Sequence, residues 1–424
     1  MMATAAVVFA LAIPRLIEFG AADILYARAD GGATDVAIGM LWAALIAISI
    51  PLWPVRRSMR MALLWAWLLR ISLIFLVSMP YFHHYSFLDL FWYFDCRTIV
   101  PNWSNLGFGH GTENLIALVW MLARVVPDSF TALNVSFAAI ALIGMYWFWM
   151  ASESFLGYPS RAIFYLLMAE PSLMFWTGMI GKEAIMILAL GLYVYAVVAW
   201  WRTGCLRPLM QVAIGVFLAG LIRTWLAGIM LGSMVVLFYA AAQGIRTRVI
   251  ITLAIVVAVR AALPFFLQMF ALQAEQDLTE QVADISGGFH GGGSAGVAFA
   301  LYGPLDLITN APWGMFSALF RPLPGDVLNP FGLVASGESA LMLVLLLRAL
   351  KRIRLRDFLD DPLVTWALAL VLLWALIYAF VSSQNFGTAV RYRVQILPML
   401  LGLLLYLGRA RTRGLPHKLE SEHA

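Results

Sequence analysis

Residues 208–241 read PLMQVAIGVFLAGLIRTWLAGIMLGSMVVLFYAA, and this stretch decides which fold the sequence predicts. As a single helix it would be about 50 Å long, whereas the hydrocarbon core of a bilayer is about 30 Å thick. It would also hold Arg223 near its middle, at a cost of about 2.5 to 3.5 kcal/mol or more. Two short helices that meet at Arg223 remove both problems. We therefore predict a helical hairpin in which 208–222 and 225–241 are separate membrane segments.

The composition is that of a polytopic membrane protein. Hydrophobic residues make up 62% of the 424 positions and charged residues only 12%, about half of the roughly 25% found in soluble domains. No long polar segment separates the apolar ones, so we predict a single all-α transmembrane helical bundle, 1–424, with no appended soluble module. The two cysteines, Cys96 and Cys205, are predicted on opposite sides of the membrane, which argues against a disulfide.

Apolar segments of suitable length predict about twelve membrane spans. The first begins at the N-terminus, lacks the basic region and cleavage site of a signal peptide, and is expected to be a retained helix. The segments are 1–17, 36–54, 62–80, 130–150, 162–180, 184–201, 208–222, 225–241, 249–270, 331–350, 363–381 and 392–408.

Basic residues lie in short runs between these segments, and with a hairpin at Arg223 the runs fall in alternate loops. By the positive-inside rule these loops and both termini are cytoplasmic, which predicts a multi-pass protein of a bacterial inner membrane. The formal net charge of +5 therefore reflects orientation, and we predict no nucleic-acid partner. The runs are Arg56, Arg57 and Arg60; Arg202 and Arg207; Arg246 and Arg248; Lys351, Arg352, Arg354 and Arg356; and Arg409, Arg411, Arg413 and Lys418.

The opposite loops are predicted to face the periplasm and to present polar groups on one face of the bundle. Two of these outward loops are long, 81–129 and 271–330. In the second loop, the glycine cluster 287–294 is either a flexible loop or an anion cradle. Residues 312–325 are typical of a short interfacial helix that ends in a rigid turn.

The stretch 83–97, HHYSFLDLFWYFDCR, begins the first of these loops and mixes aromatic residues with carboxylates. This mixture suits a membrane surface and is costly inside hydrocarbon, so we interpret it as the lip of an active site. Asp89 has aromatic neighbours and is the preferred general base. Asp95 is a second catalytic candidate, or else pairs with Arg97. The two aspartates would lie about 120° apart on one helix, which argues against a mutual dyad.

His83, His84 and Asp89 do not have the spacing of a known metal motif, so we predict no resident metal and no other firm cofactor. A divalent cation held jointly by a carboxylate and a donor pyrophosphate stays compatible with the sequence.

Isolated cations at helix ends suit a lipid-linked phosphate or pyrophosphate. Arginine offers a fixed charge and a bidentate fork, and lysine a compact charge. Each such cation could instead be an anchor at the lipid headgroups. Glu170 and Glu338 lie in or beside apolar segments, where each either pairs with a buried cation or serves packing and capping. The candidate cations are Lys182, Arg223, Arg321, Arg391 and Arg393.

Four short motifs lie in or beside the predicted outward turns. They are LDLFWY at 88–93; PSLMFW at 171–176 with GKEA at 181–184; FRPLP at 320–324 with Asn329, Pro330 and Glu338; and NFGTAVRYR at 385–393 with Leu397 and Pro398. Together they resemble the multi-spanning GT-C-type glycosyltransferases and the related membrane polymerases of bacterial surface polysaccharide loci, over about residues 80 to 400.

This resemblance implies a GT-C-like bundle that transfers a sugar from a polyprenyl-linked donor to a glycan acceptor on the outer face, with the outer-loop acid at Asp89. The acidic loop follows the third apolar segment, whereas the family generally places it after the first. This favours a polysaccharide polymerase or a divergent transferase over a protein-glycosylating enzyme. In this interpretation Trp92 and Tyr93 stack on sugar rings. The donor pyrophosphate docks against Arg223 and Arg321, the favoured cations, with Lys182 as a further candidate. The same outward layer also contains the substrate-binding candidates Glu183, Arg391 and Arg393.

Two other functions remain open at this point. A transporter or flippase of a lipid-linked saccharide predicts repeats and polar residues near the middle of the membrane, and the sequence has no such repeat. A non-catalytic subunit of an envelope polysaccharide assembly would make the outward cations simple anchors.

Overall fold

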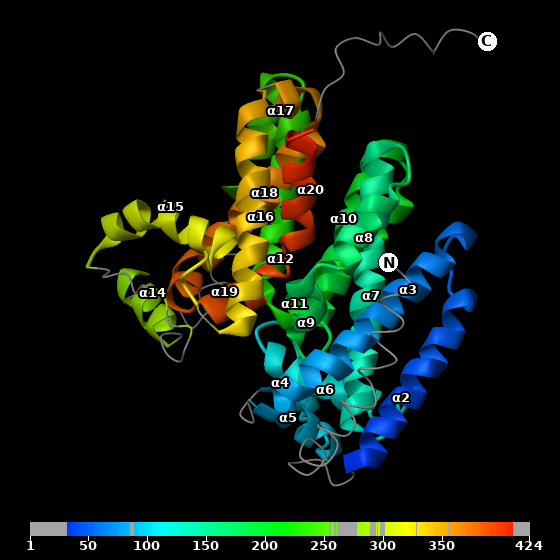
Figure 1. Cartoon of the computed structure of the whole chain (residues 1–424). Coiled ribbons are helices and arrows are strands. Elements are labelled where there is room, and N and C mark those ends of the chain that lie inside the picture. The colour runs from blue at the N-terminus through cyan, green and yellow to red at the C-terminus, as the bar shows by residue number, and fades with distance from the viewer. Residues whose placement is uncertain are drawn as a thin grey trace, which may run out of the picture.

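The computed structural model describes residues 32–84, 89–253, 256–257, 260, 278–288, 294, 296, 302–327, 329–354 and 356–409. Within these ranges the chain forms helices and no β-strand, which confirms the all-α prediction. The α-helices, drawn in Figure 1, are α2 Gly32–Ser49, α3 Arg60–Leu73, α4 Met79–His84, α5 Asp89–Asp95, α6 Gly111–Leu122, α7 Phe130–Leu156, α8 Arg161–Met168, α9 Pro171–Trp176, α10 Lys182–Thr203, α11 Arg207–Ile222, α12 Thr224–Ala241, α14 Leu278–Gly287, α15 Pro304–Phe320, α16 Pro330–Arg352, α17 Arg356–Asp360, α18 Pro362–Gln384, α19 Phe386–Arg393 and α20 Leu397–Leu407.

Seven helical segments of the described chain are long and apolar enough to cross a membrane, or eight if the bent pair α19 and α20 counts as one span. The chain is therefore a helical membrane protein, and each of the seven overlaps a predicted span. They are Gly32–Leu52, Arg57–Phe82, Phe130–Leu156, Lys182–Thr203, Thr224–Ala241, Pro330–Arg352 and Pro362–Gln384.

Two of the remaining predicted spans differ from the structure for local reasons. Segment 162–180 is not one helix, because α8 ends at Met168 and Pro171 begins α9, where its ring and missing N–H interrupt the ladder. Segment 392–408 is not one continuous helix either, because α19 ends at Arg393, α20 begins at Leu397, and the two are bent by 75°. The predicted short helix at 208–222 is confirmed as α11, whose 16 residues are fewer than the roughly 20 of a straight crossing. Segment 1–17 and most of 249–270 lie outside the described residues.

The centre of the bundle is a close pairing of α7 and α10. A Cβ atom at Gly191 would come 2.2 Å from the carbonyl oxygen of Gly144. Glycine at both positions therefore lets the two backbones approach, as in small-residue contacts between membrane helices. Helix α11 also packs on α10, while α12 and α15 pack on α18. Figure 1 shows α15 running crosswise to the upright α18.

Polar contacts gather at one end of the bundle around arginines. Arg202 pairs with Asp361 (Nη2–Oδ2 2.7 Å), and Arg348 donates to the carbonyl oxygen of Gly408 (2.8 Å). Four of the predicted basic runs contribute to this end, so these runs share one end of the bundle, as the alternation requires. We call it the arginine-rich end and define it by Arg56, Arg202, Arg348, Arg352 and Arg409.

The predicted interfacial helix lies within α15, which begins earlier than expected and contains Pro312 in its interior. The helix ends at Phe320, and the following turn is closed by Arg321 and Asp326. In segment 271–330, the carbonyl oxygen of Ser294 accepts from Phe386 N at the start of α19 (2.9 Å), and Gly296 N donates to the carbonyl oxygen of Gln384 at the end of α18 (2.8 Å). Most of the glycine cluster lies outside the described residues.

Candidate functional site

Arg223 forms the corner between α11 and α12, as the sequence predicts. Its backbone is extended (φ −143°, ψ 93°), which ends one helix and lets the next begin. The side chain is buried, and two of its three nitrogens have acceptors among the described residues. Its guanidinium donates to Tyr378 Oη (3.0 Å) and Glu183 Oε1 (3.3 Å), and it lies 4.1 Å from the ring centre of Tyr392.

Glu183 is the centre of the site. Its side chain is 1% exposed, and its carboxylate accepts two bonds from Arg391, Nε–Oε1 at 2.9 Å and Nη2–Oε2 at 3.3 Å. Arg391 also reaches Asp89 Oδ2 across 3.4 Å. We call Asp89, Glu183, Arg223 and Arg391 the Glu183 network. Its members come from α5, α10, the α11–α12 corner and α19, so four turns far apart in sequence meet at the end of α10 opposite the arginine-rich end.

Lys182 stands beside this network, and its Nζ atom donates to Thr112 Oγ1 of α6 (2.8 Å). Three cations and the two carboxylates of Asp89 and Glu183 leave the group with one net positive charge. Charges in a poorly hydrated site are weakly screened, so this excess attracts an anion to the exposed side of the network.

Sequence reasoning missed four polar-tipped side chains that hold the network in place. Tyr378 Oη accepts from Arg223 and from Trp225 Nε1 (2.8 Å) and donates to Gln395 Oε1 (3.2 Å). Trp374 Nε1 donates to the same amide oxygen (3.3 Å). A signal was present, because Tyr378 and Gln395 are polar-tipped residues in or beside apolar segments, and buried polar groups require partners.

Helix α6 and the loop before it brace the Arg223 corner. Asn114 Nδ2 donates to the carbonyl oxygens of Leu221 (2.5 Å) and Gly107 (2.7 Å). Gly111 lies so close to α11 that a Cβ atom there would stand 2.0 Å from the carbonyl oxygen of Ile222. The last carbonyls of a helix lack intrahelical partners, so α6 both covers the end of α11 and fixes the direction in which Arg223 leaves it.

The predicted lip lies beside the network. The Asp89 side chain is 63% exposed and Trp92 is 51% exposed, so both are open to a ligand. Tyr93 is only 5% exposed, which leaves its ring unavailable for stacking on a sugar. Burial, reinforced by the Asp89 carboxylate, raises the pKa of Tyr93 to about 12, so its phenol stays neutral at physiological pH.

Asp95 is exposed at the far end of α5 from Asp89. Its alternative role as the partner of Arg97 is wrong. Arg97 Nε instead pairs with Asp128 Oδ1 (2.5 Å), and its guanidinium lies 3.7 Å from the ring centre of Phe94.

Arg321 and Arg393 lie in a second cluster, where α15, α16 and α19 meet. Arg321 forms a two-pronged pair with Asp326, Nε–Oδ2 2.9 Å and Nη2–Oδ1 2.6 Å. Arg393 is fully buried, and its Nη1 donates to the carbonyl oxygens of Leu319 and Arg321 and to Ser339 Oγ at 3.0–3.1 Å. Its Nε and Nη2 have no acceptor among the described residues. Both arginines therefore have internal partners and do not join the cations around Glu183.

Glu170 and Glu338 lie near Arg393. Glu338 accepts from Ser172 N (2.8 Å) and from its hydroxyl, while Glu170 accepts from Leu173 N (2.5 Å) at the start of α9. The two carboxyl groups are within hydrogen-bonding reach of each other. Both acids thus bond to the first turn of a short helix and also face a buried cation.

Within the described chain, no three His, Cys, Asp or Glu side chains gather closely enough to hold a metal ion. The side chains of His83 and His84 lie outside that part. A divalent cation shared with a donor pyrophosphate stays a prediction.

No family model matches this chain, and no significant similarity connects it to a curated protein or a solved structure. The resemblance to GT-C-type enzymes therefore stays a prediction from short motifs. What the chain does has to be inferred from the chemistry of the Glu183 network.

Proposed function

We propose that this chain is a membrane glycosyltransferase or polysaccharide polymerase that takes a sugar from a polyprenyl-(pyro)phosphate-linked donor. The supporting observation is the Glu183 network, in which cations from separate turns and one exposed carboxylate meet at one end of an apolar bundle. Such a donor requires apolar surroundings for its lipid, cations for its phosphates, and a base for the acceptor hydroxyl.

The positive-inside rule supports an orientation for this reaction. The arginine-rich end would face the cytoplasm of a bacterial inner membrane, and the Glu183 network the periplasm. Envelope glycan synthesis, with other polysaccharide assembly proteins as partners, is the setting that fits this orientation.

The proposed reaction assigns one task to each exposed group. The Asp89 carboxylate takes the proton of an acceptor hydroxyl, and that oxygen attacks the anomeric carbon of the donor sugar. The bond from this carbon to the phosphate oxygen breaks, and the lipid (pyro)phosphate leaves with the electron pair. Arg391 and Lys182 stabilise the negative charge that develops on the leaving group. Trp92 offers a face on which a sugar ring stacks.

The contacts of Arg391 suggest how the donor enters. Its pair with Glu183 is two-pronged and buried, whereas its contact with Asp89 is 3.4 Å long and the Asp89 side chain is 63% exposed. An exposed ion pair of this kind contributes about 0 to 1 kcal/mol. An incoming phosphate can therefore replace Asp89 at Arg391 Nη1 and leave the carboxylate of Asp89 as a base.

Asp89→Asn tests this proposal, with Asp128→Asn as the matched control. The Asp128 side chain is also 63% exposed and also pairs with an arginine, Arg97. The gene is deleted in its host, each variant is restored at equal membrane levels, and surface polysaccharide and lipid-linked intermediates are separated on a gel. We expect Asp89→Asn to accumulate lipid-linked units without polymer, and Asp128→Asn to make normal polymer. Normal polymer from both variants would exclude Asp89 as the base.

One observation favours a second candidate, a transporter or flippase of a lipid-linked saccharide. The carboxyl groups of Glu170 and Glu338 lie within hydrogen-bonding reach of each other near Arg393, and ionisable residues inside a membrane bundle are typical of proton relays in pumps and transporters. In that case Glu338→Gln would stop lipid-linked saccharide from reaching the outer face, while Asp89→Asn would not. A non-catalytic subunit predicts normal polymer from both variants.

A further inference from the structure

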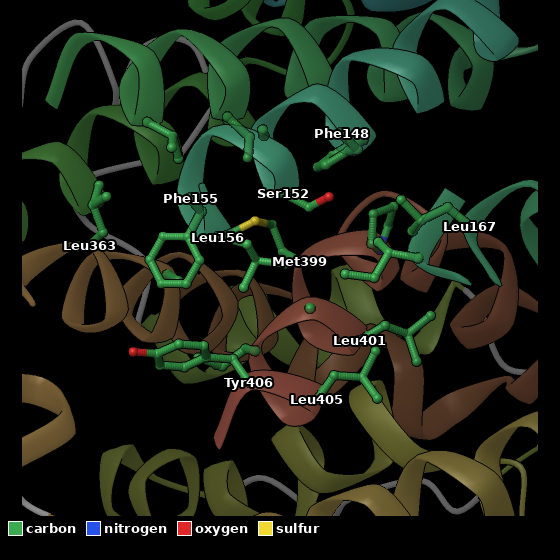
Figure 2. Close-up of a pocket in the computed structure, with 18 of the residues that line it drawn as sticks. Phe148, Ser152, Phe155, Leu156, Leu167, Leu363, Met399, Leu401, Leu405 and Tyr406 are labelled. Atoms are coloured by element: carbon green, nitrogen blue, oxygen red, sulfur yellow. The ribbon is translucent and has the colours of Figure 1, made fainter. Parts of the chain in front are cut away.

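An apolar cavity of about 270 Å³ lies at the arginine-rich end, between α7 and α8 on one side and α18 and α20 on the other. Figure 2 shows side chains that line it, among them Phe148 and Phe155 of α7 and Leu405 and Tyr406 of α20. An apolar cavity of ~150 Å³ already holds a benzene-sized guest. The cavity therefore has room for part of a hydrocarbon chain.

Two arginines stand over the aromatic side chains of this cavity. Arg409, the charged member of its lining, lies 3.5 Å from the ring centre of Tyr406, and Arg202 lies 5.2 Å from that of Phe155. The two rings are themselves 4.9 Å apart, edge to face. Both cations thus mark the same mouth of the cavity.

The charge around this mouth is positive. The arginines Arg202, Arg348, Arg352 and Arg409 outnumber their carboxylate neighbours Asp357 and Asp361 by two. The contact between Arg409 and Asp357 is long, 3.6 Å, and the arginine side chain is 37% exposed. A contact of this kind is weak, so an external anion can compete for Arg409.

We infer that this cavity binds one acyl chain of an anionic diacyl phospholipid from the surrounding bilayer, with its phosphate held by Arg409 and Arg202. The apolar interior of the cavity suits the acyl chain of such a lipid, and the arginines at its mouth suit the phosphate headgroup. Attraction of anionic headgroups to clustered arginines is the charge complementarity that selects this occupant over a neutral lipid.

The lipid site is separate from the proposed transferase site. Val194 and Val198 of α10 line the cavity and follow Glu183 by 11 and 15 residues, which is about 16 to 23 Å along a helix axis. Loss of either site therefore leaves the other in place, and the inference does not rest on the proposed function.

Gly402 of α20 offers a way to fill the cavity without a clash. It lies in the wall, and a Cβ atom there would meet no atom within 4 Å. Gly402→Leu therefore projects a side chain into the space intended for the acyl chain. Gly337→Leu is the matched control, because Gly337 of α16 lies outside the cavity lining and has equally open surroundings.

The full chain is purified in detergent, stripped of lipid, and titrated in native mass spectrometry with phosphatidylglycerol, phosphatidylcholine of identical chains, or polyprenyl phosphate. We expect one phosphatidylglycerol to bind in preference to phosphatidylcholine, and Gly402→Leu to abolish that binding. Arg409→Ala should weaken phosphatidylglycerol binding about fivefold, the effect of one arginine near an anionic headgroup. Gly337→Leu and the exposed Arg207→Ala should leave it unchanged.

Three results would overturn the inference. One is equal binding of the two phospholipids, and another is undiminished phosphatidylglycerol binding by Gly402→Leu. The third is preferential binding of polyprenyl phosphate that Gly402→Leu abolishes, which would assign the cavity to the donor lipid. A thermal unfolding transition shows that each variant is folded. The glycine variant tests whether the acyl chain occupies the cavity, and the arginine variant tests whether the phosphate binds at its mouth.

Discussion

Arg391 and Glu183 are 208 residues apart in sequence, yet their side chains meet through two hydrogen bonds of 2.9 and 3.3 Å. The contact joins the start of α10 to α19, and Arg223 adds a third bond to the same carboxylate. Because Glu183 is buried, each charge offsets the cost of removing the others from water. This ion pair therefore ties together three distant segments of the bundle at one end.

Glu183→Gln should destabilise the protein strongly. The substitution keeps the size of the side chain but leaves Arg223 and Arg391 without their buried counter-charge, which costs about 3 to 5 kcal/mol. Asp361→Asn is the control, since it breaks the partly exposed pair with Arg202, worth about 0 to 1 kcal/mol, and asparagine still caps a helix. Thermal unfolding in detergent compares the two. Equal losses would show that Glu183 is not the electrostatic centre of this end.

Arg391→Lys should keep the fold and reduce activity. Lysine retains the charge that neutralises Glu183 but has no planar fork, so it cannot bind Glu183 twice and still offer a donor at Asp89. Loss of one charge-assisted hydrogen bond, about 1.5 to 3 kcal/mol, corresponds to about a ten- to hundredfold decrease in polymer formed at matched membrane levels. Arg97→Lys, at another exposed aspartate pair, should retain normal polymer. Unchanged polymer from Arg391→Lys would remove Arg391 from donor binding.

The sequence predicts the Arg223 corner because the cost of a charge in hydrocarbon is a local rule. It also predicts that Asp89, Lys182 and Arg391 share one end of the bundle, because the number of predicted membrane spans between them places all three on the same side. It does not predict that Glu183 pairs with Arg391, because that choice depends on how α10 and α19 pack. The alternative pair of Asp95 and Arg97 is wrong for the same reason. Closeness in sequence does not decide which carboxylate Arg97 meets in the folded bundle, and it meets Asp128.

The broken helices show the limit of a hydropathy pattern. Segment 162–180 is uniformly apolar enough to suggest one span, yet Glu170 and Pro171 mark the break between α8 and α9, and the proline rule could have located it. The bend between α19 and α20 has a weaker signal in the sequence than the break at Pro171. Pro398 lies just inside α20, but the amide oxygen of the buried Gln395 at the bend accepts from Trp374 and Tyr378, which belong to α18.

The turn after α15 should lose stability in acid. The Arg321 guanidinium holds the pKa of Asp326 below its ordinary value, so the carboxylate contributes stability that is fully present above about pH 4. That contribution is lost as the pH falls through the lowered folded-state pKa. The difference in melting temperature between wild type and Asp326→Asn should be constant near neutrality and shrink below about pH 4. A difference that grows in acid would contradict the assignment.

Gly111→Ala should disturb the site from a distance. The new Cβ atom would stand 2.0 Å from the carbonyl oxygen of Ile222, a backbone atom that cannot move without shifting the end of α11. Overpacking of this kind costs about 1 to 3 kcal/mol, and the shift would displace Arg223 from Glu183. Gly337→Ala is the control, because its Cβ meets open space and alanine favours a helix by about 1 kcal/mol. Lower melting temperature and less polymer for Gly111→Ala alone would show that α6 positions Arg223, whereas wild-type behaviour would show that the corner holds without it.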